Sequence, residues 1–216
     1  AKKGGLSDKI VPIILAIISA ISILTTIAIL FTLLTETITF FTRVPLSKFF
    51  LSGTWNPTGS SPEFGIWALI IGTLKITVIA TIVAVPIGLG AAIYLNEYAS
   101  DRSRRIIKPI LEILAGIPTI VFGFFALTFV TPILRNLIPN LGEFNSISPG
   151  IVVGIMIVPM ITSMSEDVMS SVPDKIREGA FGLGATKFEV ATKVVLPAAT
   201  SGVVASIVLG LSLIHI

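Results

Sequence analysis

The chain has 216 residues, of which 53% are hydrophobic and only 12% are charged. The charged share is about half that of an ordinary soluble domain, and the mean hydropathy is +0.98. These values exclude an ordinary cytosolic enzyme, a disordered tail and a nucleic-acid-binding protein. They predict an all-α polytopic membrane protein that is surrounded by membrane lipid.

The sequence also lacks residue types on which many active sites depend. It contains no cysteine, and its single histidine is His215. A disulfide framework, a thiolate nucleophile, a cysteine-ligated metal site and histidine-based catalysis are therefore excluded. The phosphate-binding pattern Gly-x-x-x-x-Gly-Lys-Ser/Thr does not occur. We therefore expect a chain that is not an enzyme, needs no cofactor and hydrolyses no ATP alone.

Apolar runs predict about five spanning helices, because one span needs about 20 apolar residues. In chain order the runs cover 10–35, 66–95, 110–138, a stretch from Gly150 and a stretch from Pro197. The first run carries no charge, and the second contains Lys75. The third has Glu112 near its start and Arg135 near its end, and the fourth becomes polar at residues 165–167.

The basic residues predict the orientation of these spans. They concentrate before the first run, between the second and third runs, and between the fourth and fifth runs: Lys2, Lys3, Lys9, Arg102, Arg104, Arg105, Lys108, Lys175, Arg177, Lys187 and Lys193. By the positive-inside rule these regions, and with them the N-terminus, are cytoplasmic. The expected cytoplasmic loops are 96–109 and 173–196, and the expected outside loops are 36–65 and 139–149.

Local patterns refine this arrangement. The first outside loop is rich in proline, glycine and serine over residues 51–62, which predicts turns rather than a helix. Trp55 and Trp67 are typical of the membrane interface. Gly150 and Gly154 form a small-xxx-small pair that permits close helix contact. Prolines inside the apolar runs predict kinks, which suit either a bundle around a path or simple packing: Pro86, Pro118, Pro132 and Pro159.

The loop over residues 173–197 contains the most informative pattern. It reads as two short amphipathic helices with a glycine turn between them at Gly184. Apolar residues recur in this predicted cytoplasmic loop: Phe181, Leu183, Phe188 and Val194. A loop on its own does not favour the exposure of such residues. They either pack on the helical bundle or dock in the groove of a partner, and the residues alone leave both possibilities open.

The same loop resembles the coupling motif of ABC-importer permeases, which reads Glu-Ala-Ala, then Gly, then Ile-x-Leu-Pro. The matching residues keep the spacing of the motif, with Gly179 in place of the first alanine and Val194 in place of isoleucine: Glu178, Gly179, Ala180, Gly184, Val194, Leu196 and Pro197. The resemblance implies that this loop docks on a separate ATPase subunit. It also implies that Leu196 and Pro197 begin the next span, and proline suits the first turn of a helix.

Further stretches resemble the Pst-type phosphate permeases, the C subunit more than the A subunit: 53–57, 85–90, 112–118, 148–152 and 165–167. The resemblance implies the type I transmembrane fold of ABC importers. It implies a permease subunit that moves inorganic phosphate across a bacterial-type inner (plasma) membrane. The implied partners are a second permease subunit, a cytoplasmic ATPase dimer that binds the ATP and an extracytoplasmic phosphate-binding protein. A permease for another substrate, a secondary transporter or channel, and a membrane phosphate-sensing regulator remain alternatives.

We expect three parts along the chain. Residues 1–65 form an N-terminal transmembrane helix with its outside loop, and residues 66–210 form an incomplete permease domain. Residues 211–216 read like a translated sequencing adaptor, so we expect an artefactual tail and a truncated C-terminus.

Charged residues near the spans have two interpretations each. Lys75 either lowers the barrier for a phosphate anion on the transport path or extends its amino group to the outer interface. Glu166 and Asp167 either pair with Lys175 and Arg177 or keep anions from leaking through the inner mouth. Glu112 is expected to pair with Lys108, four residues before it.

Overall fold

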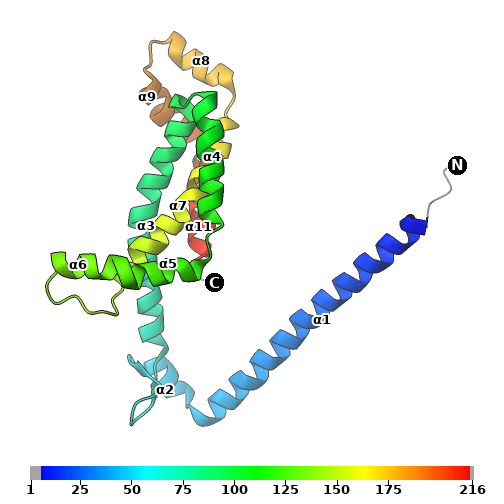
Figure 1. The fold of residues 1–216 in the computed structure, drawn as a ribbon, viewed down its shortest axis with the longest axis vertical. Helices are drawn as coiled ribbons and strands as arrows, with labels where there is room; N and C mark the ends of the chain where they lie inside the picture. The colour runs from blue at the N-terminus through cyan, green and yellow to red at the C-terminus, as the bar shows by residue number, and fades with distance from the viewer. Residues whose placement is uncertain (1–5, 215–216) are drawn as a thin grey trace. The chain divides into compact units, whose positions relative to one another are not determined.

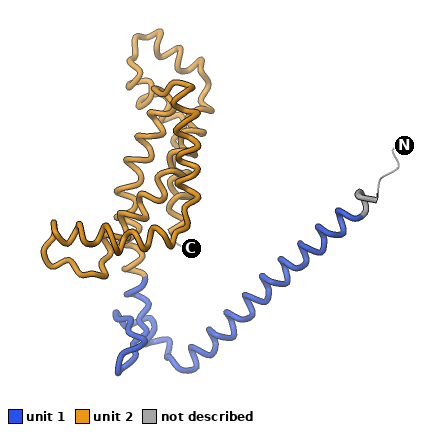
Figure 2. The backbone as a smooth tube through the Cα atoms, in the orientation of Figure 1, with its two compact units in different colours: residues 1–69 blue, residues 70–216 orange. Residues whose placement is uncertain are grey.

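The computed structural model describes residues 6–214, with side chains from Ile10 onward. Lys2 and Lys3, which contribute to the predicted orientation, and residues 215–216 of the predicted tail lie outside the described residues. The side chain of Lys9 lies outside them as well. The chain forms two compact units, residues 1–69 and residues 70–216 (Figure 2).

The long helix α1 (Leu6–Arg43) of unit 1 continues past its predicted end at Thr35. Threonine hydroxyls along it donate to carbonyls one turn back, as Thr37 Oγ1 does to Leu33 O at 2.7 Å. These bonds satisfy the hydroxyl groups inside the helix itself. The helix is therefore compatible with an apolar environment despite its many threonines.

The predicted outside loop starts only after Arg43 and contains more than turns. Three short elements follow: α2 (Leu46–Leu51), β1 (Trp55–Asn56) and β2 (Glu63–Phe64). The two strands are antiparallel, with Trp55 opposite Phe64. The ring of Phe40 meets Phe49 and Phe64 edge to face, at centroid distances of 5.8 and 5.5 Å. Such aromatic contacts favour one arrangement of this end of unit 1.

Unit 2 holds the remaining elements, which Figure 1 labels, and the boundary after Leu69 falls inside α3. The α-helices are α3 (Ile66–Ile93), α4 (Asp101–Ala115), α5 (Thr119–Phe125), α6 (Thr131–Leu137), α7 (Ile147–Ser170), α8 (Asp174–Gly182), α9 (Lys187–Glu189), α10 (Leu196–Ala198) and α11 (Thr200–Ser212). Short π-helical turns extend three of them: η1 (Tyr94–Tyr98), η2 (Ala126–Val130) and η3 (Val190–Val195).

By length and composition, four helical stretches among residues 6–214 are able to cross a membrane: 10–43, 66–98, 119–137 and 147–170. A fifth is added if the bent pair 187–198 and 200–212 is one span. The prediction of an all-α polytopic membrane protein with about five spans is confirmed.

The predicted third span, 110–138, is wrong in its first part. The structure breaks the chain at Gly116–Pro118, and only residues after this break belong to the span. Pro118 has no N–H for the helical ladder and disfavours helical geometry at Ile117, which explains the break. The predicted cytoplasmic loop 96–109 is largely helical, because η1 and α4 occupy most of it. α4 packs along α7, whereas α5 and α6 turn away from its direction (Figure 1).

Small residues bring α3 and α7 together. The side of α3 that is buried carries a small residue at every fourth position: Ala80, Ala84, Gly88 and Ala92. Opposite them on α7, a Cβ atom added at Gly150 would lie 2.8 Å from Ile79, and one at Gly154 would lie 2.9 Å from Val83. The close contact that the glycine pair predicts is therefore present.

The contact between α7 and α11 is of the same kind. A Cβ atom added at Gly210 would lie 2.8 Å from Ile161. One added at Gly202 would overlap with Val168. The core of unit 2 thus lies where α7 packs between α3 and α11, and this core supports the polar end described next.

Candidate functional site

Residues 173–197, here called the coupling segment, fold as the two short helices and glycine turn that the sequence predicts. Where α8 ends, the Gly184 N–H donates to Phe181 O at 2.9 Å and the Ala185 N–H donates to Ala180 O at 3.1 Å. This pair of bonds satisfies the last carbonyls of a helix and needs a left-handed residue between them. Gly184 supplies it, with φ of +85°, which costs other residues about 1–2 kcal/mol.

The second helix of the coupling segment begins with a reciprocal cap. Thr186 Oγ1 accepts from the Glu189 N–H at 3.3 Å, and Glu189 Oε2 accepts from the Thr186 N–H at 3.0 Å. This capping box fixes the start of α9. The helix continues through η3 and α10, and the chain bends by 77° before α11. The sequence predicts that Pro197 begins the next span, but it lies before this bend and α11 begins at Thr200.

The apolar side chains of the coupling segment divide between two surroundings. Leu183, Phe188 and Phe181 leave 91%, 65% and 42% of their surface exposed. A second set is buried in, or packed against, a cluster at the adjoining ends of α3 and α7: Ala180, Val190, Val194, Val195 and Leu196. Of the apolar residues that the sequence singles out, Val194 therefore packs on the bundle, whereas Phe181, Leu183 and Phe188 stay exposed. The exposed set is free to meet a partner.

The other matched residues of the motif lie at the surface. Glu178 and Gly179 are exposed on α8, and Pro197 is exposed in α10. A Cβ atom added at Gly179 would meet no other atom within 4 Å. Packing within the described chain therefore does not require glycine at the position where the motif has alanine.

A buried carboxylate joins α4 to α7. Glu166 is 1% exposed, and its Oε1 lies 3.5 Å from Arg104 Nε. Lys108 Nζ contacts Glu166 Oε2 and lies 3.0 Å from Asp167 Oδ1. Burial disfavours the charged form of Lys108, but bonds and attraction from the two carboxylates outweigh it and raise the pKa of Lys108. The predicted partners Lys175 and Arg177 are wrong, because the folding of residues 101–115 as α4 brings Arg104 and Lys108 there instead.

Arg177 of α8 reaches a different group of partners. Its Nε lies 3.3 Å from Glu97 Oε1, and Nη1 donates to Asp174 Oδ1 at 2.8 Å. Its Nη2 donates to Asn96 Oδ1 at 3.0 Å and to Met169 O at 2.7 Å. The coupling segment is therefore bound to η1 and to the end of α7 by one side chain.

Asn96 and Glu97 are not among the site residues that the sequence predicts. The available signal is that these two polar residues directly follow a long apolar run and precede the basic stretch of residues 102–108. A carboxylate and an amide at the end of a span are able to receive cations from neighbouring helices. The small-residue repeat from Ala80 to Ala92 is a second overlooked signal, since its four-residue period is legible in the sequence.

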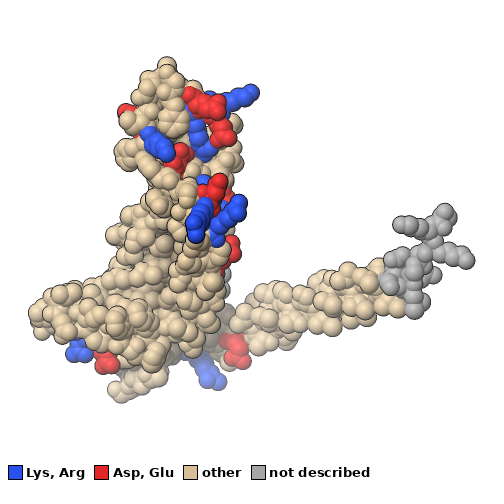
Figure 3. Space-filling view, turned by 45° about the horizontal axis from the view of Figure 1, so that its top comes forward, with Lys and Arg blue, Asp and Glu red and all other residues tan. Residues whose placement is uncertain are grey.

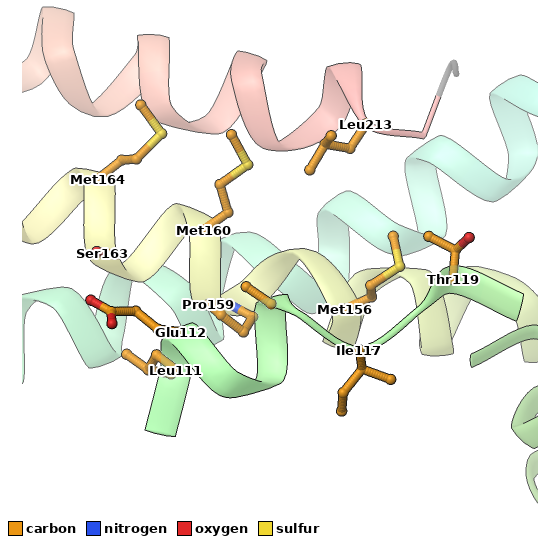
Figure 4. A pocket seen from close by; sticks show the side chains of 11 residues that line it. Leu111, Glu112, Ile117, Thr119, Met156, Pro159, Met160, Ser163, Met164 and Leu213 are labelled. Carbon is orange, nitrogen blue, oxygen red and sulfur yellow. The ribbon is translucent and has the colours of Figure 1, made fainter. Parts of the chain in front are cut away.

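The predicted pair of Glu112 with Lys108 is wrong, since Lys108 contacts Glu166 and Asp167. Glu112 instead lines an open hollow of about 750 Å³ between α4, α5 and α7 (Figure 4). Three methionines of α7 line the same hollow: Met156, Met160 and Met164. Among the described lining residues, Glu112 is the one that carries a charge. The hollow therefore favours apolar groups and repels anions.

Lys75 lies apart from these groups. It is exposed on α3 and lines an open hollow of about 600 Å³ together with Asn145 and Ser146, near the start of α7. The structure does not bring Lys75 together with Glu166 and Asp167. Within residues 6–214, no three His, Asp or Glu side chains gather as ligands of a metal ion.

A family model described as "Binding-protein-dependent transport system inner membrane component" matches residues 84–215. The probable ABC transporter permease protein YqgH of Bacillus subtilis is 37% identical over 166 residues, 76% of this chain and 53% of the relative. The phosphate transport system permease protein PstC of Haemophilus influenzae is 37% identical over 183 residues, 76% of this chain and 58% of the relative. PstC 1 of Mycobacterium tuberculosis is 33% identical over 196 residues, with the same coverage of 76% and 58%.

These relatives confirm the predicted resemblance to Pst-type permeases. The chain spans about half the length of the curated relatives that it matches, 53% for the first of them. Among solved structures, the MetNI methionine ABC transporter in inward-facing conformations gives a TM-score of 0.53 at 21% identity. That match covers 69% of this chain and 68% of the other. It supports the predicted type I transmembrane fold and is a likeness of fold alone.

Proposed function

Because the chain belongs to the family of binding-protein-dependent transport system inner membrane components, we propose that it is a permease subunit of an ATP-driven phosphate importer. Phosphate is proposed as the substrate because the chain is similar to PstC proteins. It is 37% identical to that of Haemophilus influenzae over 183 residues. The subunit works without a cofactor or an active site of its own, and a partner ATPase binds the ATP.

The coupling segment is the surface that meets the ATPase in this proposal. Leu183 and Phe188 expose most of their apolar surface beside the rigid turn at Gly184. Exposed apolar groups of this kind are stabilised when a groove of a partner covers them. Glu178 and Gly179 lie on the exposed side of the first helix, where a docked ATPase would touch them.

The charge distribution supports the orientation. Figure 3 shows most of the charged side chains of unit 2 at the end that carries α8 and α9. We assign this end, and the N-terminus, to the cytoplasm of a bacterial-type inner membrane. The strands β1 and β2 and residues 139–149 then face outside, where a phosphate-binding protein delivers its cargo.

Residues 66–210 form the permease domain in this proposal, and residues 1–65 form an additional anchor. A second permease subunit encloses the path together with this one. Lys75 is the candidate path charge, because an exposed cation on α3 attracts a phosphate anion. Glu166 faces two cations and joins α4 to α7, which favours a structural role, and Asp167 is 63% exposed beside it, at the inner mouth.

The test is uptake of radiolabelled phosphate by cells that lack this subunit but contain the ATPase, the binding protein and the other permease subunit. We expect the full-length protein to restore ATP-dependent uptake that excess sulfate does not inhibit. If sulfate inhibits uptake, the proposed substrate would change to another anion, but the assignment as an ATP-driven importer would stand. A protein that inserts in the membrane without binding the ATPase would overturn the proposal as a whole.

A further inference from the structure

The connection between α7 and α8 is short. α7 ends at Ser170 and α8 begins at Asp174. Ser171 and Pro173 are exposed, and Val172 is the buried residue between them. A helix attached only through this connection would pivot when a partner moves it. The position of α8 therefore depends on contacts made by its side chains.

Ala180 packs against the apolar cluster at the ends of α3 and α7, and Arg177 supplies the polar contacts of α8. The side chain of Arg177 is 16% exposed although α8 lies at the surface. All three guanidinium nitrogens contact oxygen atoms, which belong to η1, to α7 and to α8 itself. The contact with Glu97, whose side chain is 7% exposed, is ionic at 3.3 Å. A planar guanidinium held from several sides fixes the direction of its helix, which a lysine ammonium does not.

The network continues from η1 into the bundle. Arg104 of α4 donates through Nη2 to Leu95 O at 2.8 Å and to Asn96 O at 3.2 Å. Asn96 Nδ2 donates to Glu166 O at 3.4 Å. The end of α3 is therefore held between an arginine from α4 and Arg177 from α8. α8 is thus linked by hydrogen bonds and an ion pair to η1 at the end of α3 and to α7, and through η1 to α4.

We propose that Arg177 is a positioning residue that makes α8 and the adjoining ends of α3 and α7 move as one body. When the ATPase displaces the coupling segment, Arg177 transmits the displacement from the first coupling helix to the spanning helices. The second coupling helix is attached differently, by apolar packing of Val190 and Val195. This proposal rests on the proposed function, since it assigns the transmission step of the same transporter.

The first experiment compares transport with ATP consumption. The full-length subunit, in complex with its ATPase and the other permease subunit, is reconstituted in vesicles with the binding protein. Arg177→Gln is expected to keep ATP hydrolysis and to lower the phosphate moved per ATP at least about tenfold. In Arg177→Lys, the phosphate moved per ATP should lie between the values of the parent protein and of Arg177→Gln. Arg105→Gln is the matched control, because Arg105 lies on α4 outside the coupling segment, is exposed, and has no ion pair among the described residues.

Charge exchange separates a positioning role from a general loss of stability. Glu97→Gln should lower the phosphate moved per ATP, here called the coupling ratio, as Arg177→Gln does. The double variant Arg177→Glu with Glu97→Arg should recover part of the lost coupling ratio. An unchanged ratio in Arg177→Gln would overturn the proposal. If Arg177→Gln does not insert in the membrane, Arg177→Lys replaces it in the test, and an unchanged coupling ratio in that variant would overturn the proposal.

A distance measurement tests the link even if the proposed function fails. The 216 residues contain no cysteine, so spin labels at Ile176→Cys and Arg102→Cys occupy the only thiols of this part of the chain. We expect Arg177→Gln to broaden the distance distribution between α8 and α4 at an unchanged melting temperature. A distribution as narrow as that of the parent would overturn the link, whereas failure of the parent to bind the ATPase would overturn only the proposed function.

Discussion

The two halves of α7 meet their neighbours in opposite ways. From Gly150 to Ile161 the helix packs through small and apolar residues, and the closest approaches to α3 occur at glycines. From Ser165 to Met169 it is joined to α4 and α8 through a buried carboxylate and a backbone carbonyl. One helix thus combines a packed half with a polar half that carries the connections to the coupling segment.

The two kinds of contact differ in how far the sequence reveals them. Glycines act through their own position, so Gly150 and Gly154 predict a close contact without knowledge of the partner. A long charged side chain reaches any element within several ångströms. Its partner therefore depends on where that element lies, and the sequence does not show this for Glu166.

The largest expected effect comes from breaking the polar half. Glu166→Ala leaves Arg104 and Lys108 without the buried carboxylate between them. We expect the free energy of unfolding to fall by about 3 kcal/mol. This is the low end for a broken buried ion pair, because Arg104 and Lys108 keep about a third of their side chains exposed to water. Thermal unfolding of the purified protein in detergent measures this loss. Asp167→Ala is the control and should cost under about 1 kcal/mol; equal losses would contradict the importance of burial.

Disrupting the packed half of α7 should lower the free energy of unfolding somewhat less. In Gly154→Ala the new Cβ would lie 2.9 Å from Val83 Cβ and 3.0 Å from Ala80 O. α3 and α7 must then move apart, at a cost of about 2 kcal/mol for overpacking. The same unfolding assay applies. Gly90→Ala on α3 has open space and should be neutral or stabilising, so a comparable loss there would argue against the small-residue contact.

The turn of the coupling segment is a third kind of contact, because it depends on backbone geometry alone. Gly184→Ala and Gly182→Ala both place a Cβ in open space, and of the two only Gly184 has positive φ. We expect Gly184→Ala to raise the free energy of the left-handed turn by about 1 kcal/mol and to reduce phosphate uptake several-fold. Gly182→Ala should transport normally. Equal uptake by the two variants would show that the left-handed turn is not needed.

The smallest effect is expected at the departure from the family motif. Gly179→Ala restores the alanine of the motif at an exposed helix position with open space. Helix propensity predicts stabilisation by up to about 0.8 kcal/mol. Amide hydrogen exchange of α8 would detect it as slower exchange with unchanged uptake. Faster exchange would indicate that Gly179 has a packing role that its open surroundings do not suggest.

Much of the fold follows from the sequence, and the exceptions have common causes. Apolar runs locate the spans, and the spacing around Gly184 locates the coupling turn. The break at Pro118 is missed as the end of a helix because hydropathy continues across it. The start of α4 at Asp101 is missed because its basic residues resemble a loop. That second error moves Lys108 and Arg104 to the wrong surroundings, so the partners of Glu166 are also predicted wrongly.

The three methionines that line the hollow beside Glu112 have a mechanical consequence. Methionine is unbranched and polarizable, so Met156, Met160 and Met164 can refill this space by side-chain rotation while the backbone of α7 stays in place. The lining of the hollow is thus deformable, in contrast to the glycine contacts on other parts of the same helix. Oxidation of these sulfur atoms would turn a soft apolar lining into a polar one. The surface of α7 that adapts most readily is therefore also the one most vulnerable to oxidants.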